Sequence, residues 1–169
     1  MQVNELVTDL YHHMEWADAS AWATVLRHDT ARHDGLIRGT LHHIHLVQQA
    51  FLAVWQGDPI DRHAGEGLEA AALAAWARPY YARARAHVAA SAGPALDTPL
   101  TVPWSGQIAA HLGFEPGPTT LGETMVQVYA HTGHHRGQVL SRLRALDVTP
   151  PLVDYIAWLW QRRPPAAWT

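Results

Sequence analysis

The chain has 169 residues, a formal net charge of −3 and 48% hydrophobic residues. These values predict one soluble domain spanning residues 1–169, with enough chain to bury a sizeable core. The absence of a basic excess and of runs of like charge argues against nucleic-acid binding. No cysteine is present, which excludes disulfides, thiolate nucleophiles and sulfur metal ligands.

The start of the chain does not resemble a targeting segment. Residues 1–5 lack the basic region and the long apolar core of a signal peptide. No run approaches the roughly 18 apolar residues of a membrane-spanning helix. We therefore expect no membrane association and a cytoplasmic location.

The first half of the chain predicts three long helices. Residues 3–28 place apolar side chains at spacings of three and four, as an amphipathic helix does. Residues 34–56 repeat this pattern, between an aspartate at the start and a Gly-x-Pro stop. Residues 66–90 are rich in alanine, and Pro79 inside them should kink or break the third helix.

The second half begins with an irregular stretch and ends in helices. Residues 93–119 contain several prolines and glycines, and we expect a loop there, although residues 100–102 could form a short extended piece. Thr120 and Glu123 form a Thr-x-x-Glu capping box at the start of a fourth long helix over residues 121–146. A short, mostly apolar helix over residues 152–163 should pack on the other helices.

Four long helices without a convincing strand predict an all-α fold, a four-helix bundle. Its long irregular connection precedes the fourth long helix, and a short helix follows at the C-terminus. An up-and-down order is the simplest arrangement, although a long connection would also allow a crossover.

Histidine is the unusual component, with 13 residues against 12 lysines and arginines together. On the fourth helix, His135 falls inside the apolar stripe and His131 at its edge, whereas His134 lies roughly 140° from the stripe centre. His131 and His135 are four residues apart, so their rings lie one turn apart on one face. This spacing is typical of helices that offer two imidazoles to one metal ion.

The second helix contributes one further candidate. His43 lies roughly 60° from the centre of its apolar stripe, whereas His42 and His45 should point away, toward solvent or the outer packing surface. Three imidazoles suit zinc, nickel, iron or copper and leave a coordination position open. The sequence offers them from His43, His131 and His135. The alternative is that each inward histidine is simply a packed, hydrogen-bonded side chain.

Other residues near this cluster have expected roles. His13 could be a fourth ligand or an outer donor, but packing is the simpler role for it. Gln138 lies on the flank of His131 and could orient a ligand, whereas the phase of Arg136 favours an ion pair. Gly133 and Gly137 share the opposite side of the helix, where close helix packing or a subunit contact would explain them. Supporting groups from the first two helices could be Glu15, Asp18 and Gln48.

The segment His131-Thr-Gly-His-His-Arg-Gly-Gln138 resembles the signature of the DinB family, also called DinB/YfiT-like proteins. A Thr-Leu-x-His motif at residues 40–43 matches an earlier family helix and selects His43. The end of the chain, at residues 150–156, is also similar. The resemblance implies a bundle of four helices, often dimeric, with one divalent metal ion, zinc or nickel, on His43, His131 and His135.

The resemblance also bears on the reaction. Some relatives are transferases or isomerases that use low-molecular-weight thiols, and the family name reflects damage-inducible expression. We therefore expect a metal-dependent enzyme acting on a small-molecule substrate as a homodimer, by thiol transfer or, second, by hydrolysis. No carboxylate is placed as a general base by the sequence.

Two alternatives to an enzyme remain. A non-catalytic metal-binding stress-response protein would have its site closed by a fourth side chain, such as His13 or a carboxylate. A purely structural helical protein would bind no metal at all.

Overall fold

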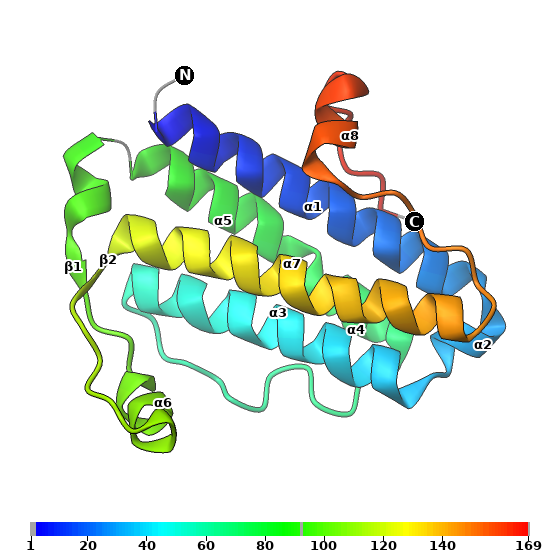
Figure 1. Ribbon diagram of the computed structural model, residues 1–169, viewed down its shortest axis with the longest axis horizontal. Helices are drawn as coiled ribbons and strands as arrows, with labels where there is room; N and C mark the ends of the chain where they lie inside the picture. Colours follow the sequence, from blue (N-terminus) through cyan, green and yellow to red (C-terminus); the bar gives the residue numbers. More distant parts are fainter. Residues whose placement is uncertain (1–2, 92, 169) are drawn as a thin grey trace.

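The computed structural model describes residues 3–91 and 93–168, and the described chain is an all-α bundle (Figure 1). The third long segment is divided in two at Pro79, which occupies the first turn of α5, as its missing N–H allows. The four long segments are α1 (Val3–Arg27), α3 (Gly35–Gln56), α4 with α5 (Ala70–Ala77 and Pro79–Ala90) and α7 (Leu121–Ala145).

The expected starts of two helices are confirmed by their capping contacts. The Asp34 side chain accepts a hydrogen bond from the backbone N–H of Ile37 at the start of α3. Thr120 and Glu123 form the reciprocal capping box at the start of α7. A single-turn helix, α2 (Asp29–Arg32), joins α1 to α3.

The crossover lies in the connection between α3 and α4, and not in the one before α7. The start of α3 lies beside the start of α4, where Arg38 pairs with Glu69 at 2.6 Å. Arg83 of α5 donates to Gln56 at the end of α3. The two segments are therefore parallel, and the connection 57–69 runs back along α3 (Figure 1). Its 13 residues can span up to about 45 Å, more than the roughly 33 Å length of α3.

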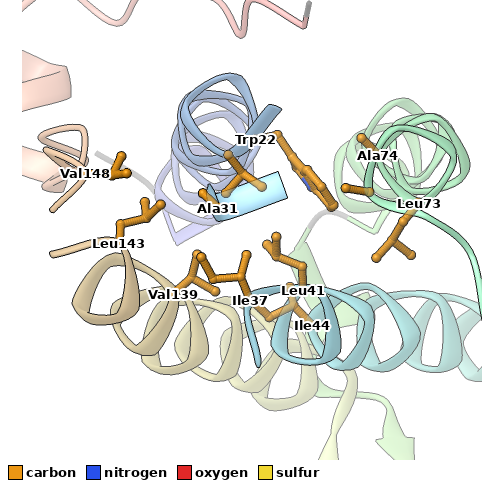
Figure 2. Packing of buried hydrophobic residues seen from close by; sticks show 12 residues of the cluster. Trp22, Ala31, Ile37, Leu41, Ile44, Leu73, Ala74, Val139, Leu143 and Val148 are labelled. Atoms are coloured by element: carbon orange, nitrogen blue, oxygen red, sulfur yellow. The ribbon is translucent and has the colours of Figure 1, made fainter. Parts of the chain in front are cut away.

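The interior consists of two neighbouring clusters of apolar side chains. Figure 2 shows the first, where side chains from α1, α3, α4 and α7 converge on a common centre. Its large members are Trp22, Ile37, Leu41, Ile44, Leu73, Val139 and Leu143. The second cluster lies nearer the start of α7 and contains Tyr11, Met14, Phe51, Leu52, Tyr80, Tyr81, Met125 and Val128.

The expected loop at 93–119 contains ordered structure. A 3-10 turn (Gly93–Asp97) leads into β1 (Pro99–Leu100), which pairs antiparallel with β2 (Thr119–Thr120). Between the strands lies α6 (Ser105–Leu112), which stands apart from the long helices (Figure 1). An eight-residue helix and two-residue strands are too short for hydrophobic periodicity to reveal.

The C-terminal helix, α8, covers Tyr155–Trp160 and is shorter than the expected 152–163. Its Trp158 is buried, so the helix packs on the bundle as expected. None of the described helices combines the length and the hydropathy needed to cross a membrane.

A buried polar network joins four segments of the bundle around Asp18. The Asp18 Oδ1 atom accepts a hydrogen bond from Arg136 Nη1 at 2.8 Å, which confirms the ion pair expected for that arginine. Its Oδ2 accepts from the Tyr81 hydroxyl at 2.6 Å and from Gln48 Nε2 at 3.2 Å. Burial and the neighbouring carboxylate raise the pKa of Tyr81, so its hydroxyl remains a donor.

His45 extends this network, and its predicted outward orientation is wrong. The side chain is fully buried. Its Nε2 accepts from Trp22 Nε1 at 2.8 Å, and its Nδ1 donates to Gln48 Oε1 at 2.9 Å. The prediction assumed one buried stripe on α3, but α3 contacts α7 as well as α4 and α5. The buried arc of the helix is therefore wider than its apolar stripe.

Substituting Asp18→Asn should lower the free energy of unfolding by about 3–5 kcal/mol, because it leaves the buried Arg136 cation without a counter-charge. The matched control is Arg38→Ala, which breaks an exposed pair with Glu69 and should cost less than about 1 kcal/mol. Urea denaturation measures both. Equal, small losses would contradict a structural role for the network.

The free energy of unfolding should decrease as the pH is lowered, because of His45. Burial lowers the pKa of His45 below the ordinary value of 6.5. A proton on Nε2 would also face the Trp22 N–H. Below pH 6.5 the unfolded chain then binds a proton that the folded chain does not, which costs up to about 1.4 kcal/mol per pH unit. His45→Gln preserves an acceptor and a donor without titrating, so its stability profile should be shallower between pH 6.5 and 5. The exposed His33→Gln is the control and should keep the original slope; parallel profiles for all three proteins would refute the assignment.

Candidate metal centre

The structure brings together the three histidines that the sequence selects. His43 comes from α3, and His131 and His135 come from successive turns of α7. One ring nitrogen from each lies within 4.8 Å of the others. The Nε2 atoms of His43 and His131 are 3.1 Å apart. His43 is exposed and the other two are half-buried, so the cluster lies at the surface of the α3–α7 pair.

The register between α3 and α7 places His43 opposite the pair on α7. At one end, Arg142 donates two hydrogen bonds to Asp34 Oδ2, at 2.8 and 3.1 Å. Toward the other end, Trp55 Nε1 donates to Thr124 Oγ1 at 3.0 Å. The two helices are antiparallel, and His43 lies between these contacts. Sliding either helix by one turn would break both contacts and separate the three rings.

Gln138 orients one of the rings. His135 Nδ1 donates to Gln138 Oε1 at 2.8 Å, the partner that a ligating histidine normally requires. A proton on Nδ1 leaves a lone pair on Nε2. The sequence placed Gln138 beside His131, whereas the structure pairs it with the other histidine of α7. His131 Nδ1 is buried and has no hydrogen-bond partner among the described residues.

The surroundings of two of the rings, those of His131 and His43, favour their neutral form. Burial, followed by the neighbouring His135 and His43, lowers the pKa of His131 to about 4. Burial and His135 also lower the pKa of His43. Neutral imidazoles offer lone pairs at neutral pH, which is the form that binds metal ions.

These residues fit a divalent cation. Two imidazole nitrogens on a tetrahedral zinc ion are about 3.3 Å apart, given Zn–N bonds of about 2.0–2.1 Å. The 3.1 Å separation between the His43 and His131 nitrogens is close to this value. Without a cation, two Nε2 lone pairs would face one another unless one ring held its proton there. A donor set of three neutral nitrogens suits several first-row metals and does not select among them.

No fourth histidine, cysteine or carboxylate joins the cluster within the described part of the chain. His13 is buried elsewhere: its Nε2 donates to the Val153 carbonyl and its Nδ1 accepts from the Tyr129 hydroxyl. Packing is therefore its role. His42 donates to the Ala64 carbonyl and also lies outside the cluster.

The supporting roles expected for residues of α1 and α3 take a different form. Asp18 and Gln48 belong to the buried network and form no hydrogen bond to a ring of the cluster in the described structure. Gln48 Nε2 does donate to Thr132 Oγ1 at 3.1 Å, beside His131 in the chain. Glu15 pairs with Arg85, on another face of the bundle. Asp18 and Gln48 therefore bind side chains of α7 that adjoin the histidines in the chain, and not the rings themselves.

Close helix packing does not explain the two glycines of α7. No atom lies within 4 Å of the position that a Cβ would take at Gly133 or Gly137. Both residues instead line an open pocket of about 540 Å³ together with Tyr129 and Arg136. The proposed subunit contact stays a prediction.

Sequence reasoning missed a cavity beside the histidines. It has a volume of about 870 Å³ and is lined by His43 and His131, by apolar residues of α3, and by several residues between Val102 and Pro116. The available signal was the number of large apolar residues in a segment expected to be a loop. They are Val102, Trp104, Ile108, Leu112 and Phe114.

The double substitution His131→Ala/His135→Ala should abolish metal binding, because a single imidazole cannot hold the ion. Elemental analysis of the purified natural chain should find one divalent ion per chain, and the variant should contain none. His134→Ala is the matched control, since it removes a neighbouring histidine outside the cluster and should retain the ion. Equal metal content in all three proteins would exclude this site.

Comparisons with known proteins agree with the geometry. The family described as the DinB superfamily matches residues 37–139, a span that contains all three histidines. No curated protein and no solved structure matches the chain significantly. The matched span begins in α3, ends in α7 and covers more than half of the sequence. The chain therefore belongs to the DinB superfamily.

Proposed function

We propose that the protein is a metal-dependent enzyme that holds one divalent ion, zinc or nickel, on His43, His131 and His135. The observation that carries this proposal is the combination of three convergent nitrogens with an adjoining cavity of about 870 Å³. Three protein ligands leave a position for a substrate atom, as in catalytic zinc sites. A site for storage or structure would be closed by a fourth side chain, and His13, the candidate for that role, is engaged elsewhere.

The residues of the chain prepare this chemistry. The hydrogen bond from His135 Nδ1 to Gln138 holds the imidazole so that the other ring nitrogen, His135 Nε2, is free to bind the metal ion. Little reorganisation is then needed when the ion binds. A divalent cation held there would supply Lewis acidity, which lowers the pKa of a thiol or water that joins it. The wall of the adjoining cavity is mainly apolar, so it offers a surface for the apolar part of a substrate beside the histidines.

Thiol transfer suits the cavity better than hydrolysis does. A hydrolase needs a general base near the attacking water. Among the described residues that line the cavity, Glu123 is the one carboxylate, and its Oε2 accepts from the Thr120 backbone N–H at 2.8 Å in the helix cap. In thiol transfer, the sulfur forms a bond to an electrophilic carbon, the bond to the leaving group breaks, and the thiol proton is released. A thiol whose pKa is lowered needs no separate base.

The proposal is tested with the purified protein loaded with zinc or with nickel. Low-molecular-weight thiols are paired with a panel of alkylating electrophiles, and product is measured by mass spectrometry. We expect turnover that stops on chelation and in His131→Ala/His135→Ala, and that persists in His134→Ala. Turnover by the metal-free chain, or a fourth protein ligand in X-ray absorption spectra of the loaded protein, would refute the proposal. Ester and amide hydrolysis in place of thiol transfer would reverse the order of the two reactions.

A further inference from the structure

Residues 101–118 form an arm, which leaves the bundle after β1 and returns at β2. Its base is held by the pairing of the two strands and by Thr119 Oγ1, which donates to the Leu100 carbonyl at 2.8 Å. A second attachment is aromatic: the rings of Trp104 and Phe51 meet edge to face, with centroids 5.0 Å apart. The arm is therefore anchored beside the end of α3.

The arm turns apolar side chains toward the cavity. Ile108 is 51% exposed and Phe114 is 55% exposed, although both are large apolar residues. Both line the cavity, opposite Val47 and Ala50 of α3. Grouped apolar exposure of this kind marks a binding surface more often than an accident of packing.

The cavity is continuous with the metal centre. His43 and His131 are part of its wall, so a molecule inside it can reach the open coordination position. Its volume falls within the range of roughly 300–1,000 Å³ typical of small-molecule sites. The polar groups in the wall are partly engaged already, because Thr124 accepts from Trp55 and Glu123 caps α7. What remains available is mainly apolar surface.

We propose that the substrate carries an alkyl or aryl group, which the arm and α3 hold while its polar end meets the metal ion. This inference rests on the proposed function only for the contact between the polar end of the substrate and the metal ion. A small molecule is favoured over a second copy of the chain because two of the three histidines form part of the cavity wall. The arm is then the part of the protein that determines substrate specificity.

The first test measures binding without turnover. Zinc-loaded protein is titrated calorimetrically with straight-chain alkanethiols from ethanethiol to hexanethiol. Each methylene should tighten binding about three- to four-fold, the increment for transfer of a CH₂ group out of water. A hexanethiol with a terminal hydroxyl should lose most of this gain. Binding that does not depend on chain length would overturn the inference.

A second series separates this inference from the metal assignment. Primary alkanols are used to displace an anilinonaphthalenesulfonate dye from the metal-free protein, and longer chains should displace it at lower concentrations. If the alkanols show this trend and zinc adds nothing to thiol binding, the proposed function fails while the cavity stands. If thiols bind through zinc and neither series depends on chain length, the cavity assignment fails alone.

Substitutions then locate the binding. Ala50→Trp fills the cavity, and Ile108→Asn makes the arm polar at an exposed position that carries little folding cost. Both should flatten the chain-length dependence and leave the zinc content unchanged. Leu36→Asn is the matched control, because it replaces an apolar residue of α3 that is also exposed, at 66%, and lies outside the cavity. A shift from dimer to monomer in sedimentation of Ile108→Asn, with unchanged alkanethiol affinity, would overturn the inference by making this face a subunit interface.

Discussion

The rotation of α7 about its own axis depends on the buried Asp18 carboxylate. The carboxylate accepts a hydrogen bond from Arg136 of α7 and another from Gln48 of α3. The Gln48 amide also donates a hydrogen bond to Thr132 of α7. Both α7 residues of this network immediately follow the two histidines of the cluster in the chain. One residue step on a helix is about 100°, so holding Thr132 and Arg136 inward turns His131 and His135 toward α3. The histidine cluster is thus oriented from an adjacent face of the helix, by groups that form no hydrogen bond to its rings.

This arrangement explains why a polar network is present in an otherwise apolar interior. Buried ion pairs add little net stability, because removing two charges from water costs about as much as their attraction returns. Here the carboxylate accepts three hydrogen bonds, and the fully buried His45 joins through the amide of Gln48. A fully satisfied network has one good geometry, whereas apolar packing tolerates several. Specificity of helix rotation is what the network contributes, and the convergence of the three histidines requires it.

The sequence was informative wherever structure is determined locally. The ends of α3 and α7 were predictable because Asp34 and the Thr120 box act within one helical turn. The three histidines were predictable because helical phase and the i, i+4 spacing are local as well. The 57–69 crossover and the buried position of His45 were not, since both depend on which helices are neighbours. The arm escaped prediction for a third reason, because its helix and strands contain too few residues for a hydrophobic period to be recognised.

The attachment of the arm has a consequence for how such a protein can diversify. Residues 101–118 join the bundle through a two-residue strand pair and one aromatic contact, and they contribute little to the buried core. Insertions and replacements there leave the helix register and the histidine positions untouched. A new function on an existing fold generally requires substitutions near the site that leave the packing of the core unchanged. In this fold that freedom is concentrated in one short excursion of the chain, so the lining of the cavity can evolve separately from the histidine cluster.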